Sequence, residues 1–255
     1  MLPRFLTVYV SLLFAAFAYD NTKNQSGTPW NKILEESPDR KQTFVNMLLP
    51  YINEQNQKIL MDRDFVEHFF AKYPNTQSEA RISADEYAKL LDIAKTYKVG
   101  YIFDKKEYFD KIDIIPASLV LSQAALESGW GSSRVSLASN NLFGQKSFGS
   151  KNYVKATGNA SVKYAAFDSI GDAVKSYMTN LNSHEAYKEF RKKRADTKRK
   201  NLEFTGLKAA NTLINYSEVS NYTAMLSQMI KSYFSAYDEA KNIISSGALK
   251  AGFIH

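Results

Sequence analysis

Apolar and small residues fill most of positions 114–131, and their pattern predicts a buried helix. Pro116 is compatible with a first helical turn, where its missing N–H costs nothing. Gly129 suits the helix exit, because glycine adopts a left-handed conformation at little cost. We therefore expect a helix over residues 116–128, closed by this glycine.

The charged residue of this helix is Glu127, and it continues an apolar stripe. Val120, Ala124 and Glu127 follow one another at spacings of four and three, which places them on one helix face. Apolar neighbours and the negative end of the helix dipole would both raise the pKa of this carboxyl. A carboxyl that stays protonated near neutral pH is a candidate general acid. The alternative is a glutamate that only reaches solvent at a helix end.

Helical spacing of apolar positions recurs along most of the remaining chain. Pro50 predicts a kink or break in the first such segment, and Ser83 and Ser169 are expected to cap helices. The predicted helical segments are 39–60, 64–73, 83–100, 169–181, 188–200, 207–214 and one that starts near 221.

Residues 151–167 alternate instead, around Thr157-Gly-Asn159, and predict a small β-hairpin. The fold class is therefore mainly α (α+β), with a hairpin lobe. We divide the chain into a signal peptide (1–18), a polar linker (19–38), an N-terminal helical extension (39–100) and a main domain (101–245). The extension consists of the predicted helices at 39–60, 64–73 and 83–100.

The N-terminal residues predict export. Arg4 precedes an apolar run at 5–18, and Ala16-Phe-Ala18 is typical of a signal cleavage site. The run is shorter than the roughly 20 residues that span a bilayer. We expect cleavage after Ala18 and a mature chain in the periplasm or cell envelope, with an uncleaved membrane anchor as the alternative.

Composition sets further bounds on the chain. It has 255 residues and 44% hydrophobic content, sufficient for a sizeable core. There are no cysteines, so neither disulfides nor thiolate metal sites are available. His68, His184 and His255 lie far apart and form no metal-ligand spacing. We expect no metal or cofactor, and a monomer.

The net charge of +7 is concentrated in one segment. Positions 188–200 hold eight bases and two acids, so this segment carries +6. Such a run is typical of an exposed helix surface, and equally of contact with an anionic wall polymer, a membrane surface or nucleic acid. The predicted export argues against nucleic acid as a partner.

Two motifs add a resemblance. Residues 125–131 (ALESGWG) and 140–146 (NNLFGQK) closely resemble the N-acetylglucosaminidase family of peptidoglycan hydrolases. Residues 40–50 and 176–191 are similar to the Bax-type branch of that family, so the resemblance covers roughly 40–237. It implies a lysozyme-like catalytic domain that acts on the glycan strands of peptidoglycan, with Glu127 as the acid.

The same resemblance implies further site residues. Residues 141–146 would line the cleft, and a tyrosine near the C-terminal helix would face it; Tyr216 and Tyr222 both fit that position. Phe143 and Tyr153 either stack on sugar rings or plug the base of the cleft. The substrate-binding candidates are Gln123, Asn141, Phe143, Lys146 and Tyr153.

The chain departs from the family pattern at the second acid, which belongs in the hairpin. Residues 128–167 contain no Asp or Glu, and the first acid after Glu127 is Asp168. Asp168 is the candidate second group, with a helix-capping role as its alternative. If no carboxylate serves, the 2-acetamido oxygen of the substrate is the remaining nucleophile.

The sequence thus predicts an endo-β-N-acetylglucosaminidase of peptidoglycan. Within enzymes, a muramidase or lytic transglycosylase is the rival interpretation, because both use one helix-borne glutamate. The missing second acid also leaves open a module that binds the wall without cutting it.

Overall fold

The computed structural model describes residues 30–74, 82–147, 152–155, 161–213 and 221–239. The α-helices are α1 (Trp30–Glu35), α2 (Arg40–Lys72), α3 (Ala84–Tyr97), α4 (Lys105–Lys111), α5 (Ala117–Ser128), α6 (Arg134–Ser139), α7 (Ile170–Ser183), α8 (Lys188–Arg199), α9 (Gly206–Ala210), α10 (Tyr222–Met229) and α11 (Ala236–Glu239). A 3₁₀ turn, η2 (Glu185–Tyr187), precedes α8, and a π-helical segment, η3 (Ile230–Phe234), follows α10. Strands β1 (Tyr153–Lys155) and β2 (Lys163–Ala165) pair antiparallel, with Val154 opposite Tyr164. The mainly helical fold with a hairpin lobe is confirmed.

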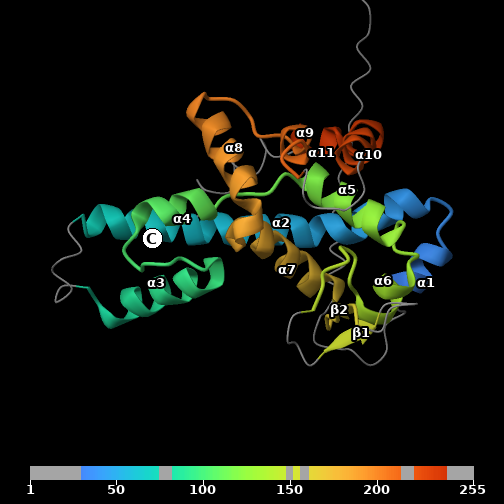
Figure 1. Ribbon diagram of the computed structural model, residues 1–255, viewed down its shortest axis with the longest axis horizontal. Helices are drawn as coiled ribbons and strands as arrows, with labels where there is room; N and C mark the ends of the chain where they lie inside the picture. Colours follow the sequence, from blue (N-terminus) through green and yellow to red (C-terminus); the bar gives the residue numbers. More distant parts are fainter. Residues whose placement is uncertain (1–29, 75–81, 148–151, 156–160, 214–220, 240–255) are drawn as a thin grey trace, which may run out of the picture.

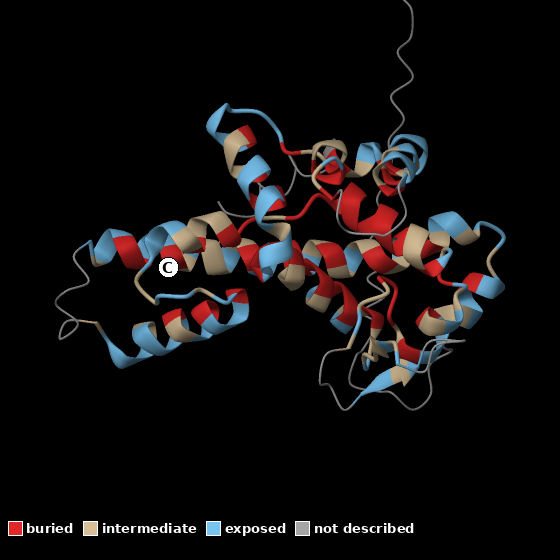
Figure 2. Cartoon of the chain, in the orientation of Figure 1, coloured by how far each residue is buried: buried red, intermediate tan, exposed pale blue. Residues whose placement is uncertain are grey.

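The core is built around α2 and α5, which lie side by side (Figure 1). Helix α7 packs across α2, and α9 to α11 cover the opposite side of α5. Buried residues gather on α5 and on the faces of α2 and α7 that meet there (Figure 2). Helices α3 and α4 pack on the far half of α2, away from the hairpin.

The break that the sequence predicts at Pro50 does not occur in α2. The segments expected as two helices form one helix of 33 residues, and Pro50 lies inside it. An interior proline costs about 3 kcal/mol, which the burial of the apolar face of α2 offsets. Asn56 also fixes this helix to the chain before α5: its side chain donates to the carbonyl of Ile115 and accepts from the same residue's N–H, both at 2.9 Å.

Helix α1 differs from the expected linker. Part of the segment predicted as polar linker is helical, because Leu34 is buried and Trp30 packs against the core. The Trp30 indole N–H donates to Asn140 at 2.8 Å. A Cβ on Gly131 would lie 2.9 Å from both Trp30 and Leu34, so a glycine there lets α1 approach the loop after α5. The expected signal peptide at 1–18 lies outside the described residues.

The N-terminus of α5 is buried and begins at Pro116, which forms no side-chain cap. Asp238 of α11 serves instead. Its carboxylate accepts from the Ser118 N–H at 3.1 Å, from the Ser118 hydroxyl at 2.6 Å and from the Gly206 N–H at 2.6 Å. One acidic side chain therefore caps α5 from the C-terminal helix and ties in α9.

Helix α8 changes the interpretation of the basic segment. Arg194 is buried and donates to the carbonyls of Asp110, Lys111, Asp113 and Ile114 and to the side chain of Asn182, at 2.7 to 3.3 Å. Burial lowers the pKa of its guanidinium to about 10. Arg191 is also buried, and Lys198 forms an ion pair with Asp113 at 2.6 Å. Three of the eight bases thus hold α8 in place.

Candidate active site

Helix α5 places Glu127 at the wall of a large open cavity. Gly129 ends the helix with φ 58°, as its position predicted. Residues one turn earlier on α5 are fully buried, whereas Glu127 is half-buried. The cavity that it lines has a volume of about 1400 Å³. The carboxyl therefore lies between the core and solvent.

Helix α7 supplies one long side of this cavity. Six of the seven α7 residues that line it are spaced by three and four, as one helix face requires: Asp172, Lys175, Ser176, Thr179, Asn180 and Ser183. The seventh is Tyr177. Twelve residues rise about 18 Å along a helix, so this side of the cavity is long. Thr96 and Lys98 at the end of α3, and Ala186 and Tyr187 of η2, close one end of the cavity, and Lys146 and Tyr164 lie on its hairpin side.

Burial raises the pKa of Glu127 above its ordinary value. A hydrogen bond from the hydroxyl of Tyr222 acts in the opposite direction, because it stabilises the ionised carboxylate. Burial is the larger effect, so the carboxyl retains its proton to higher pH than an exposed glutamate. This agrees with the behaviour that the sequence predicts for a general acid.

A chain of buried polar side chains holds Tyr222 against Glu127. The Gln123 amide donates to the Tyr222 hydroxyl at 2.9 Å, and the Tyr177 hydroxyl donates to the carbonyl oxygen of Gln123. Tyr177 in turn stacks on Phe143, with ring centroids 4.1 Å apart. Gln123 and Glu127 are four residues apart on α5, so one helix face presents both. Because the Tyr222 hydroxyl accepts from Gln123, it can donate its own proton to Glu127.

Replacing Tyr222 by Phe should raise the pKa of Glu127 further, because the variant loses the donor that stabilises the carboxylate. The measurement is an NMR titration of the Glu127 side-chain carboxyl. Tyr164→Phe is the matched control, because it removes a hydroxyl from another tyrosine that lines the cavity but lies outside this series of hydrogen bonds. An equal pKa in wild type and Tyr222→Phe would contradict this assignment.

Asn141 organises the loop after α6. It is buried, its amide donates to the carbonyls of Gln145 and Ala165 at 2.9 Å, and its oxygen accepts from the Gln145 N–H at 3.0 Å. The loop then passes Glu127 at Gly144, where φ is 63° and a Cβ would lie 3.7 Å from the Glu127 carboxyl. Asn141 therefore shapes the cavity wall, and Gly144 leaves space beside the acid.

The other predicted binding residues take different places. Gln123 is buried and does not line the cavity, so it supports the wall from behind. Phe143 is also buried, but it lines the cavity as part of its ring stack with Tyr177. Lys146 is exposed on the cavity wall. Tyr153 is not among the residues that line the cavity; its ring contacts the Lys163 ammonium at 4.2 Å.

Asp168 does not line the cavity among the residues that the structure describes. It immediately precedes Ser169, the N-cap of α7, and its carbonyl accepts from Asn140 at 3.2 Å. Asp172, one turn later, does line it, and its carboxylate accepts from the Ser169 hydroxyl at 2.7 Å. Tyr216 lies outside the described residues.

The sequence of this segment also matches a known protein family. Residues 104–235 match the family model Glucosaminidase, described as mannosyl-glycoprotein endo-beta-N-acetylglucosaminidase. The match spans more than half of the chain. The chain belongs to the glucosaminidase family. This membership makes it a glycosidase and agrees with the resemblance carried by residues 125–131 and 140–146.

Individual relatives of this glucosaminidase-family chain are similar over most of its length. Protein bax of Escherichia coli is 36% identical over 203 residues, which cover 78% of this chain and 67% of the relative. Among solved structures, the catalytic domain of the autolysin Auto from Listeria monocytogenes is 19% identical, with a TM-score of 0.41, over 84% of this chain and all of that domain. The glycoside hydrolase domain of Salmonella typhimurium FlgJ is 21% identical, with a TM-score of 0.37, over 66% and 99%.

Tyr164, Tyr177 and Asp172 are among the cavity residues of this glucosaminidase-family chain that the sequence-based site prediction missed. Tyr164 lies on the inner side of the hairpin, which the alternation at 162–166 already indicated. Tyr177 and Asp172 belong to α7, whose sequence predicts only core and cap positions. Among the described residues, no group of acidic or histidine side chains is arranged to hold a metal ion.

Proposed function

We propose that this glycosidase cleaves the glycan strands of peptidoglycan as an endo-β-N-acetylglucosaminidase, with Glu127 as the proton donor. The observation that carries the proposal is a half-buried carboxyl of raised pKa at the wall of a cavity of about 1400 Å³. Ligand pockets for single small molecules commonly measure about 300 to 1,000 Å³. The larger, open cavity suits a strand that enters and leaves it.

Cleavage of a glycosidic bond requires a proton on the leaving oxygen. Glu127 supplies it in its protonated form, and the Tyr222 hydroxyl stabilises the carboxylate that remains. The Gly144 backbone leaves room for the leaving oxygen to approach. The polar face of α7 offers hydroxyl, amide and ammonium groups along the path of the strand.

The second group of the reaction has two candidates. Of the described residues that line the cavity, only Glu127 and Asp172 are acidic. If Asp172 stabilises or activates the attacking group, Asp172→Asn should lower kcat by about 10²-fold or more. Asp168→Asn, its matched control, should leave kcat within about twofold of wild type, because Asp168 lies off the cavity wall. Full activity in both variants would favour attack by the 2-acetamido oxygen of the sugar.

The test of the proposed function is product analysis after digestion of purified peptidoglycan. Borohydride reduction followed by mass spectrometry identifies the sugar at each new reducing end. We expect reduced N-acetylglucosamine. Reduced N-acetylmuramic acid would indicate a muramidase, and anhydro ends would indicate a lytic transglycosylase. Binding without any product would support a non-catalytic wall-binding module.

The proposed substrate places the protein outside the cytoplasm, in agreement with the predicted signal. None of the described helices is long and apolar enough to cross a membrane. Sequencing of the mature N-terminus tests export: a chain that begins at Tyr19 supports cleavage, and one that retains Met1 contradicts it.

A further inference from the structure

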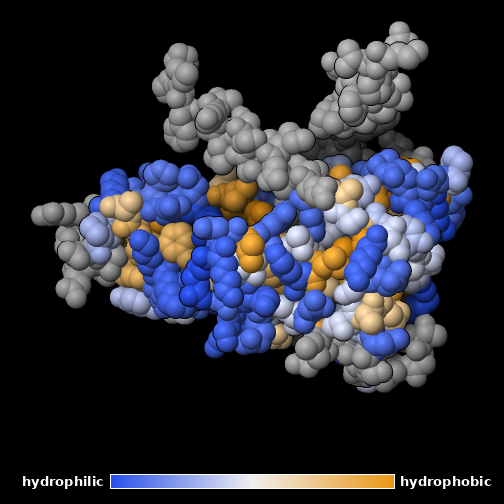
Figure 3. All heavy atoms as spheres, turned by 90° about the horizontal axis from the view of Figure 1, so that it is seen from above, coloured by the Kyte–Doolittle hydropathy of each residue, from blue (hydrophilic) through white to orange (hydrophobic). Residues whose placement is uncertain are grey.

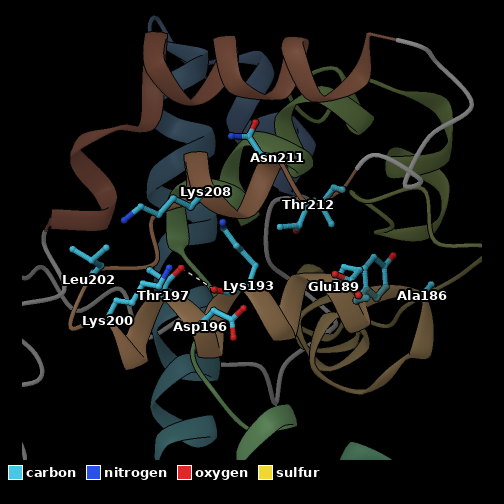
Figure 4. A pocket seen from close by; sticks show the side chains of 12 residues that line it. Ala186, Glu189, Lys193, Asp196, Thr197, Lys200, Leu202, Lys208, Asn211 and Thr212 are labelled. Atoms are coloured by element: carbon cyan, nitrogen blue, oxygen red, sulfur yellow. Dashed lines mark hydrogen bonds between the residues drawn. The ribbon is translucent and has the colours of Figure 1, made fainter.

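A second cavity, of about 750 Å³, lies between α8 and α9 (Figure 4). Its lining includes Ala186 and Tyr187, which also line the cavity of Glu127. The short turn η2 therefore borders both cavities. A branched ligand can occupy the two spaces together, with its branch point near η2.

Lysine side chains from two helices line the second cavity. Lys193 belongs to α8, Lys200 is the C-cap of that helix, and Lys208 belongs to α9. Lys193 extends from α8 towards the helix that carries Lys208 (Figure 4). Within the described part of the chain, neither Lys193 nor Lys200 forms an ion pair, whereas Lys208 donates to the Glu203 carbonyl at 2.5 Å. Lys193 and Lys200 are seven residues apart, which corresponds to about two helical turns or about 10 Å. The two ammonium groups can therefore bind two separate carboxylates at once.

The same cavity also carries negative charge and an apolar end. Glu189 is four residues before Lys193 on the same helix face, and Asp196 forms an ion pair with Arg199. Leu202 lines the cavity while 54% exposed. Seen from above, where α8 and α9 lie, the surface is largely hydrophilic with small apolar areas (Figure 3). Mixed charge disfavours a uniform polyanion and favours a short peptide with carboxylates, an ammonium group and small apolar side chains.

We propose that this cavity binds the acidic peptide stem of a peptidoglycan strand whose glycan lies along α7. The inference rests on the proposed function, because a wall strand is the polymer whose sugars carry such peptide branches. Lys193 and Lys200 bind stem carboxylates, Glu189 binds the stem's ammonium group, and Leu202 contacts its methyl groups. The site would select strands that still bear their peptides.

The test compares two substrates and two charge reversals. The substrates are glycan strands with intact stems and strands from which an amidase has removed them. Lys193→Glu changes the cavity, while Lys192→Glu places the same charge on the same helix, on an exposed residue that does not line it. We expect Lys193→Glu to raise KM for peptide-bearing strands about 3- to 10-fold, with kcat unchanged, and to leave KM for peptide-free strands unchanged.

Equal KM changes in both variants would overturn the proposal, since they would report only overall charge. Equal KM of the wild type for both substrates would overturn it as well. Calorimetric titration with the released stem peptide separates this site from the proposed function. Stem binding that Lys193→Glu weakens and Lys192→Glu does not, in a protein that cleaves no strand, would support the cavity while refuting the proposed reaction.

Discussion

Replacing Glu127 by Gln should lower kcat on glycan strands by about 10²- to 10⁴-fold, the usual contribution of a general acid. Gln retains the shape of the side chain and can still accept a hydrogen bond from Tyr222, but it has no proton to give. KM should change little, because the variant keeps the cavity wall intact. The measurement is steady-state release of reducing ends. Activity within tenfold of wild type in a folded Glu127→Gln protein would refute the role of Glu127.

Glu127→Gln should also change the free energy of unfolding, in a direction that the pKa of Glu127 determines. Because burial raises the pKa of Glu127 in the folded protein, the folded state binds this proton more tightly than the unfolded chain. This carboxyl therefore lowers the free energy of unfolding as pH rises from its unfolded pKa through its folded pKa. Gln does not ionise, so Glu127→Gln should gain stability relative to wild type between about pH 4 and about pH 8. Urea unfolding at both pH values measures this difference.

Replacing Arg194 by Leu should destabilise the protein by about 3 to 5 kcal/mol, the usual cost of removing one partner from a buried ionic network. The variant leaves carbonyls at the end of α4 and in the segment between α4 and α5 without their donor. It also removes a cation near Asp113. Burial alone would raise the pKa of this carboxyl, but Arg194, Lys198 and Arg63 together hold that pKa below its usual value. Equilibrium urea unfolding measures the loss.

Arg199→Leu is the matched control, because it removes the same side chain from the same helix. Arg199 is exposed and pairs with Asp196 on the surface, where such pairs contribute about 1 kcal/mol or less. If the two variants lost equal stability, the buried network would not be what holds α8 in place.

The sequence predicted the position of Glu127 because its signals are local. Pro116 and Gly129 mark the ends of α5, and the apolar spacing around Glu127 sets which face is buried. The hairpin was predictable for the same reason, since strict alternation and a turn lie within 17 residues. Ser83 and Ser169 also cap α3 and α7 as expected, each accepting from the N–H three residues on.

What the sequence missed depends on contacts between distant segments. Nothing near Arg194 distinguishes it from its exposed neighbours; its partners are carbonyls about 80 residues away. Helix α2 continues through Pro50 because packing outweighs one lost hydrogen bond. Gln123 resembled a ligand for substrate, but Tyr177 and Tyr222, from two other helices, occupy its polar atoms.

The course of α2 has a consequence for how this protein can evolve. The family match begins at residue 104, yet α2 precedes it and packs on α5 and α7, two helices that line the candidate active site. Asn56 of α2 also binds both backbone groups of Ile115. A gene fusion or deletion that transferred only the matched segment would expose apolar faces of α5 and α7. We therefore expect α2 and the matched segment to fold as one unit.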